Sequence, residues 1–280
     1  MTIPTDPAGP IPTETADTVD KLEQTWAATS SLCADLSEDE WNMPTDCPGW
    51  TVKDNVSHLI GTERLLHGLP RTDHRSPTVD YVKNPIGEMN ENEVDARRSS
   101  TGAKVLAEWN TLVDLRLATL RGGDAEYFAA AAMTPTGPGT VADFLHIRVL
   151  DCWAHEQDIR RALDRPGGFD TAAAGHTIDR LTKTLPIVIG KRAGTPEGSA
   201  VTIDITGPVS RTLTYEVSGG RAGLVELPSQ PPIATVQLDT ETFTVLALGR
   251  RPAAECAHAI TIDGDTALGQ RVVEQLTMMI

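Results

Sequence analysis

The stretch HIRVLDCWAHEQDIRRALDRPGG (residues 146–168) decides how we interpret this sequence. Its apolar residues recur at helical spacing, and Pro166 and the glycines after it end the pattern, so it predicts one long helix. Asp151 and His155 are four residues apart and therefore project from one face of that helix. A carboxylate and an imidazole in this arrangement can bind a single divalent metal.

A second histidine, His58, lies in TVKDNVSHLIGTERLLHG (residues 51–68), which also has the pattern of a helix. Thr51 with Asp54 three residues later predicts a capping box at its start. If this helix faces the first, the ligand set becomes two nitrogens and one oxygen with the fourth coordination position open. An open position is typical of a zinc site that does chemistry rather than a purely structural one. Asp54, one turn before His58, is a competing carboxylate ligand.

The same residues have a purely structural interpretation. Arg148 can pair with Asp151, and His155 can pair with Asp151 or Asp158, because buried charges are costly unless they are paired or bound to a metal. His58 can equally be a histidine of the apolar core. The Asp–His pair lacks the internal glutamate of HExxH, so the pattern excludes a metalloprotease of that type.

Composition limits the classes of partner. The chain has 280 residues, 40% of them hydrophobic, and a formal net charge of −15, which disfavours nucleic acid and anionic membrane surfaces as partners. The N-terminus lacks the pattern of a signal peptide, and no apolar run reaches the roughly 18 residues of a membrane span. We therefore expect a cytoplasmic protein whose four scattered cysteines are thiols rather than disulfides. Cys152 lies beside Asp151 but points about 100° away from it. Cys47, near the start of the His58 helix, is the one thiol worth probing, and a core thiol is the alternative.

The periodicity predicts two domains after a disordered segment, residues 1–15. For residues 16–168 we expect a four-helix bundle. Its helices are predicted over 17–36, 51–67, 88–120 and 140–165, with loops over 68–87 and 134–139.

For residues 169–280 we expect a small α+β domain with an antiparallel sheet. Period-two strands are predicted over 200–206, 211–219, 234–240 and 258–264, and helices over 170–190, 239–249 and 265–279.

Two blocks, CPGWTVKDNVSHLIGTERLLHG (47–68) and RVLDCWAHEQDIRRALDRPGG (148–168), resemble the mycothiol-dependent maleylpyruvate isomerase family, within the DinB-like superfamily of metal-binding four-helix bundles. That family's patterns are GW(T/S)V.D...HL and E...H..D(I/V)...L.RP. The resemblance extends over residues 15–280. The segments FTVLALGRRP (243–252) and ITIDGDTALGQRVVEQL (260–276) are similar to the family's second domain, which is sterol-carrier-like.

The resemblance implies that His58, Asp151 and His155 are zinc ligands, with Asp151 standing where the family more often has glutamate. It implies Zn²⁺, or another divalent metal, and mycothiol as the thiol cosubstrate. It also implies that an arginine of the second domain reaches the active site, and Arg250 matches that position better than Arg251. A guanidinium there can bind a substrate carboxylate, whereas the alternative is a cation at a helix end.

We therefore expect a zinc-dependent, mycothiol-using transferase or isomerase. Its metal activates a thiol for attack on a small electrophile. Asp158 either orients His155 or its neighbours as a hydrogen-bond acceptor or forms a surface or inter-helix salt bridge. The alternative is a non-catalytic protein that binds a small molecule or lipid in its second domain and keeps a vestigial metal site. A metal-dependent hydrolase with Asp54 as its base is the third interpretation. The electrophile, the thiol, the metal and the oligomeric state stay open at this point.

Overall fold

The computed structural model describes residues 10–277 in two compact units, and the boundary between them along the chain lies between Gly167 and Gly168. None of the described helices combines the length and apolar character needed to cross a membrane. The four cysteines, all buried, form no disulfide.

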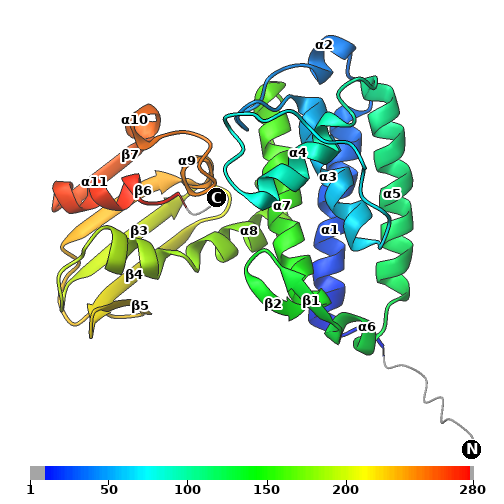
Figure 1. Cartoon of the computed structure of the whole chain (residues 1–280). Helices are drawn as coiled ribbons and strands as arrows, with labels where there is room; N and C mark the ends of the chain where they lie inside the picture. The colour runs from blue at the N-terminus through cyan, green and yellow to red at the C-terminus, as the bar shows by residue number, and fades with distance from the viewer. Residues whose placement is uncertain (1–9, 278–280) are drawn as a thin grey trace, which may run out of the picture. The chain divides into compact units, whose positions relative to one another are not determined.

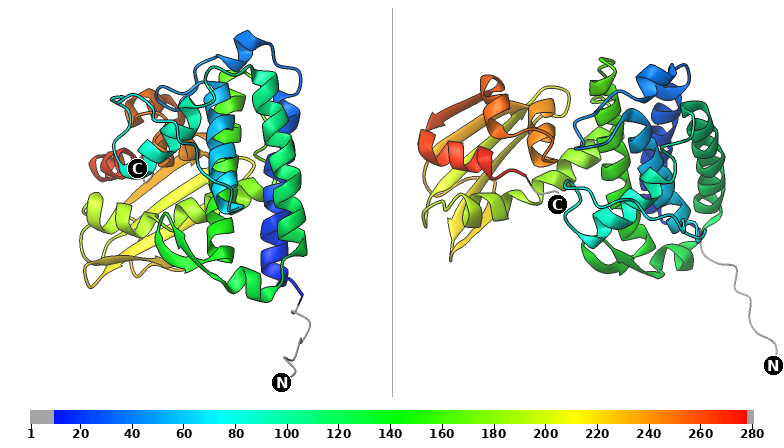
Figure 2. Two further views of the ribbon diagram at one scale, coloured as in Figure 1. Left: turned by 45° about the vertical axis from the view of Figure 1, so that its right-hand side comes forward. Right: turned by 45° about the horizontal axis from the view of Figure 1, so that its top comes forward.

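The first unit is built around four long helices that run side by side. Helix α1 packs against α5 and α7, and α3 packs against the same two, so the four close a ring around one core (Figure 1). Figure 2 shows the same arrangement from two further directions. The elements of this unit are α1 (Thr13–Cys33), α2 (Glu38–Trp41), α3 (Val52–Leu66), α4 (Pro85–Asp95), α5 (Gly102–Gly122), α6 (Ala125–Ala129), β1 (Ala131–Thr134), β2 (Gly137–Thr140) and α7 (Val141–Ala162). The predicted four-helix bundle is confirmed.

Local side-chain chemistry sets where the helices begin. Thr51 and Asp54 form the predicted capping box at the start of α3, and Thr140 and Asp143 form another at the start of α7. Each box satisfies backbone N–H groups that would otherwise lack partners in the first helical turn. These two boxes fix the helical positions of the candidate ligands that follow them.

Three predictions for this unit were wrong in detail. The helix expected over 88–120 is two helices, because α4 ends at Asp95 and Thr101 caps a new start for α5. The expected loop over 134–139 belongs instead to the hairpin of β1 and β2. Helix α1 begins at Thr13, so the end of the expected disordered segment is helical; its residues 1–9 lie outside the described residues.

The second unit is an α+β domain, as predicted. It contains α8 (Ala172–Thr182), η1 (Ile187–Arg192), β3 (Ala200–Thr206), β4 (Arg211–Ser218), β5 (Arg221–Val225), β6 (Ala234–Asp239), α9 (Thr240–Ala247), α10 (Ala253–Cys256), η2 (Ala257–Ala259), β7 (Ile260–Gly264) and α11 (Thr266–Glu274). Its sheet has the order β5-β4-β3-β6-β7. Along β6, Ala234, Val236 and Leu238 are buried while the residues between them are not, which is the expected period of two.

The sheet differs from prediction in one pairing. Most neighbouring strands are antiparallel, but β3 and β6 are parallel, because the chain returns to the far side of β3 after the β3–β4–β5 meander. Strand β5 was not predicted. The helix expected over 170–190 is interrupted after Thr182 and continues as η1 from Ile187, with Pro186 at the break, where a missing N–H interrupts helical hydrogen bonding.

Candidate metal centre

The three predicted ligands come together inside the bundle. His58 lies on α3, and Asp151 and His155 lie one turn apart on the neighbouring helix α7. His58 Nε2 is 3.3 Å from Asp151 Oδ2, and His155 Nε2 is 3.7 Å from Asp151 Oδ1. The two imidazole centroids are 4.7 Å apart. Neighbouring ligand atoms in a tetrahedral zinc site are about 3.3–3.4 Å apart, so these atoms are close to the spacing that one ion requires.

The protonation states suit a metal. Both histidines are buried, and burial lowers the pKa of His58 below its usual 6.5, which favours the neutral ring. Burial opposes ionisation of Asp151, but the Arg148 guanidinium and the neighbouring histidines outweigh it and hold the pKa of that carboxyl well below 3.8. A neutral imidazole and an ionised carboxylate are the forms that coordinate a divalent cation.

The hydrogen bonds around His155 fix which of its nitrogens faces the other ligands. Its Nδ1 is 2.7 Å from Asn55 Oδ1 and 3.3 Å from Asp158 Oδ2. An amide oxygen and a carboxylate oxygen both accept, so Nδ1 carries the proton and donates it. Nε2 then presents a lone pair toward Asp151, and two electron-rich groups face each other unless a cation lies between them. The residues therefore fit a divalent metal.

The contacts of the structural interpretation are also present. Arg148 pairs with Asp151, and His155 contacts Asp158. They leave His155 Nε2 facing Asp151 Oδ1 at 3.7 Å, which is longer than a hydrogen bond. Among the described residues, buried His58 Nδ1 also has no hydrogen-bond partner. Internal pairing therefore accounts for part of the cluster and leaves His155 Nε2 without a hydrogen bond to Asp151. His58 Nδ1 does not separate the two interpretations, because Nε2 is the nitrogen that lies beside Asp151.

A chain of buried charges lies behind the candidate ligands. Glu63, fully buried on α3, receives Arg148 Nε at 2.8 Å on one oxygen and Arg116 Nε at 2.9 Å on the other. Arg148 then contacts Asp151 with another nitrogen. Positive and negative charges alternate along this series of side chains, so each buried ion has a partner of opposite charge. Arg148 thereby connects the Asp151 carboxylate to Glu63.

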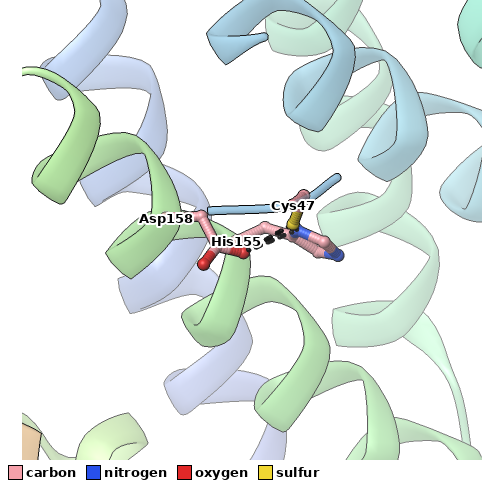
Figure 3. Close-up of side chains that lie close together, drawn as sticks. All are labelled: Cys47, His155 and Asp158. Atoms are coloured by element: carbon pink, nitrogen blue, oxygen red, sulfur yellow. Dashed lines mark hydrogen bonds and ion pairs between the residues drawn. The ribbon is translucent and has the colours of Figure 1, made fainter. Parts of the chain in front are cut away.

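Cys47 makes a second candidate group with His155 and Asp158, shown in Figure 3. The two α7 side chains meet the thiol, which comes from the segment before α3. Cys47 Sγ donates to Asp158 Oδ2 at 3.1 Å and lies 3.9 Å from His155 Nδ1. Asp158 is fully buried and also pairs with Arg161 at 2.5 Å. Because this group uses the nitrogen of His155 that donates to Asn55, we assign it to the support of His155 rather than to a metal.

Sequence reasoning missed two residues that contact this cluster. Asn55 lies three residues before His58 on α3, and that i, i+3 spacing is the signal that could have found it. Trp50, in the GW pattern before α3, lies with its ring centroid 5.2 Å from that of His58 and 5.9 Å from that of His155. Asp54, the competing carboxylate, accepts the Thr51 N–H and pairs with Arg98 at 3.3 Å.

Arg250 belongs to the second unit, whereas the three candidate ligands belong to the first. It follows the end of α9, where its backbone N–H donates to Val245 and its Nη1 donates to the Leu248 carbonyl at 3.3 Å. A cation that bonds a carbonyl here matches the helix-end alternative. Its role toward a substrate stays a proposal.

The fold and the cluster together define a class: a helix bundle with a candidate His–Asp–His metal centre, joined to a small α+β domain. The chain belongs to the mycothiol-dependent maleylpyruvate isomerase family. Residues 22–160 match the mycothiol maleylpyruvate isomerase N-terminal domain, and residues 176–271 match the C-terminal domain of the same family.

The solved structures that resemble this chain agree with the family. The crystal structure of a mycothiol-dependent maleylpyruvate isomerase aligns with a TM-score of 0.56, and that of a histidine-to-alanine mutant with 0.55. Each is 14% identical and covers 89% of this chain and 92% of its own, which establishes the shared fold. Two uncharacterized proteins of Mycobacterium tuberculosis, from strains CDC 1551 / Oshkosh and H37Rv, are each 24% identical over 193 residues, 66% of this chain and 71% of the relative.

Proposed function

We propose that this chain is a zinc-dependent, mycothiol-using transferase or isomerase in which His58, Asp151 and His155 hold the metal. The observation that carries the proposal is the orientation of His155. Its Nδ1 is held by Asn55 and Asp158, so its Nε2 lone pair points to the same place as Asp151 and His58. Family membership supports the thiol, since the solved relatives are mycothiol-dependent.

A metal held by these residues would supply a Lewis acid that favours the thiolate form of a thiol, whose pKa is otherwise about 8.5. The protein's own residues prepare that position. Asp158 and Asn55 keep the proton of His155 on Nδ1, away from the metal side. Arg148 keeps Asp151 ionised, because its guanidinium stabilises the carboxylate. The cluster is mostly buried, so water competes little with an incoming thiol.

The reaction class follows from thiolate chemistry. The sulfur forms a bond to an electrophilic carbon of a conjugated double bond, and the π electrons move to the conjugated acceptor. If the sulfur then leaves after rotation about the former double bond, the product is the geometric isomer. If a proton is added and the sulfur stays, the product is a thioether conjugate. We propose that Arg250 binds a carboxylate of the electrophile, as a guanidinium does.

The rival interpretation, a lipid-binding protein, depends on the second unit. That unit contains a hollow of about 400 Å³, lined by residues that include Leu246, Pro252, Val273 and Glu274. A lipid site needs an enclosed apolar cavity, and the charged Glu274 in the lining does not favour one.

Zinc content tests the proposal directly. We expect about one zinc per chain in the wild-type protein, loss of zinc in His155→Ala, and retention in His258→Ala, which removes an exposed histidine of the second unit as a matched control. The zinc-loaded protein should then couple mycothiol to a model electrophile. Absence of zinc from wild type after purification with zinc present would end the metal proposal, and zinc without thiol transfer or isomerisation would favour a non-catalytic role.

A further inference from the structure

A buried carboxylate on α4 lies outside the candidate metal centre and connects to it through one side chain. Glu91 is 1% exposed. It accepts hydrogen bonds from Trp50 Nε1 at 2.9 Å and from the Tyr81 hydroxyl at 2.8 Å, and it pairs with Arg98 at 2.7 Å. A carboxylate removed from water is unfavourable unless its oxygens are paired, and these three partners come from three different segments of the chain.

The Trp50 indole links Glu91 to the two histidines. Its ring centroid lies 5.2 Å from that of His58 and 5.9 Å from that of His155, so the indole packs against one side of each imidazole. The turn before it is also held. A Cβ added to Gly49, which has φ of +75°, would lie 2.2 Å from the ring of Tyr81, so Tyr81 packs directly on the Gly49 backbone. Trp50 is therefore fixed both through its N–H and through the preceding residue.

The two oxygens of Glu91 have different partners. Oε1 receives Tyr81 and Arg98, whereas Oε2 receives Trp50. All three partners are donors, so an ionised carboxylate satisfies the whole arrangement and an amide cannot. A glutamine here would turn its carbonyl toward the two donors at Oε1 and place its NH₂ against the Trp50 N–H. Replacing Glu91 by glutamine should therefore break the hydrogen bond to Trp50 and keep those to Tyr81 and Arg98.

We propose that Glu91 is a positioning residue of the metal centre: it holds the Trp50 indole against the rings of His58 and His155 and so keeps both Nε2 atoms facing Asp151. The inference rests on the proposed zinc site. If Glu91 only ties α4 to the start of α3, its substitution lowers the free energy of unfolding and leaves the affinity for zinc unchanged. If Glu91 positions the histidines, its substitution also lowers the affinity for zinc.

Three variants separate these roles. Glu91→Gln turns a donor toward Trp50, and Trp50→Phe keeps an aromatic ring but removes the N–H. Tyr81→Phe is the matched control, because it removes a hydrogen bond to Oε1 and leaves the Trp50 bond in place. Zinc affinity is measured for wild type, each variant and the Trp50→Phe/Glu91→Gln double variant by competition with a chromophoric chelator. Urea unfolding of the zinc-free proteins reports stability separately.

Loss of groups that orient metal ligands lowers affinity roughly 10- to 100-fold. Glu91 acts one contact further away, so we expect about a tenfold loss in Glu91→Gln and in Trp50→Phe, and wild-type affinity in Tyr81→Phe. Because both substitutions break the same hydrogen bond, the double variant should lose no more than either one alone. The absorption spectrum of the Co²⁺-loaded protein should shift in the same variants, since it reports ligand geometry.

Two results overturn the inference alone: Glu91→Gln is less stable yet binds zinc as tightly as wild type, or the losses multiply in the double variant. A wild-type protein that binds no zinc overturns the proposed function itself, and this inference with it. The two failures are therefore distinguishable.

Discussion

Replacing Asn55 by alanine tests the orientation of His155, on which the proposed metal site depends. Asn55 is fully buried and makes three hydrogen bonds to nitrogen and oxygen atoms, besides a longer one from Cys47 Sγ at 3.6 Å. Its Oδ1 accepts from His155 Nδ1 at 2.7 Å, and its Nδ2 donates to Thr45 at 3.0 Å and to the Thr51 carbonyl at 2.8 Å. Each such bond contributes about 1 kcal/mol net, so the zinc-free variant should lose about 3 kcal/mol of unfolding free energy in urea. Only the bond to His155 concerns the metal, and its loss should weaken zinc binding roughly 10- to 100-fold.

Ser57→Ala is the matched control for Asn55→Ala. Ser57 is also fully buried on α3, and its hydroxyl bonds the Lys53 carbonyl at 2.8 Å rather than a candidate ligand. We expect it to lose about 1 kcal/mol of stability with zinc affinity unchanged in the chelator competition. Zinc affinity within twofold of wild type in Asn55→Ala, or an equal loss in Ser57→Ala, would refute the argument that Asn55 sets the tautomer of His155.

Three further predictions follow from the same contacts. Cys47→Ala should keep its zinc in elemental analysis, whereas loss of zinc would assign the metal to the second candidate group that contains this thiol. Glu63→Gln should lose about 3–5 kcal/mol of unfolding free energy in urea, because two buried guanidinium groups lose their shared carboxylate. The zinc-free protein should lose stability below pH 6.5, because burial lowers the pKa of His58 in the folded state. The contribution of His58 to the free energy of unfolding is therefore fully present above its unfolded pKa of 6.5 and is lost as the pH falls through its folded pKa. Asp151, whose pKa lies well below 3.8, should add to this loss only at still lower pH. If urea titrations show the same free energy of unfolding at pH 7 and pH 5, the assignment of a lowered pKa to His58 is contradicted.

Much of the fold was predictable because its signals are local. The capping boxes at Thr51 and Thr140 fix where α3 and α7 begin, and apolar spacing gives their length. The wrong predictions have different causes. The break between α4 and α5 depends on the Thr101 cap, which competes with a helical pattern that continues on both sides. The parallel pairing of β3 with β6 depends on the path of the chain, and strand patterns do not encode it.

The site was predictable only in part. The i, i+4 spacing of Asp151 and His155 indicates one face of a helix. His58 lies 93 residues from Asp151, so the sequence could join it to the pair only by assuming that the two helices face each other, and the family resemblance supported that assumption. Glu63 in the sequence GTERLL has the character of a surface residue, because it is charged and stands between the polar residues Thr62 and Arg64. Its burial becomes visible only when Arg116 and Arg148 arrive from two other helices.

The buried charges bear on which partners the site favours. Arg116, Glu63, Arg148 and Asp151 form two cations and two anions in alternation, so they nearly cancel, and the two histidines contribute no charge when neutral. A divalent metal at this position therefore adds an uncompensated positive charge inside a chain whose formal net charge is −15. At short range in a buried site this local charge dominates over the distant surface charges, which solvent screens. Such a centre stabilises either a thiolate or a hydroxide. A thiol reaches its anion more easily, because its free pKa of about 8.5 is far below the roughly 15.7 of water, and this difference supports the proposed thiol activation.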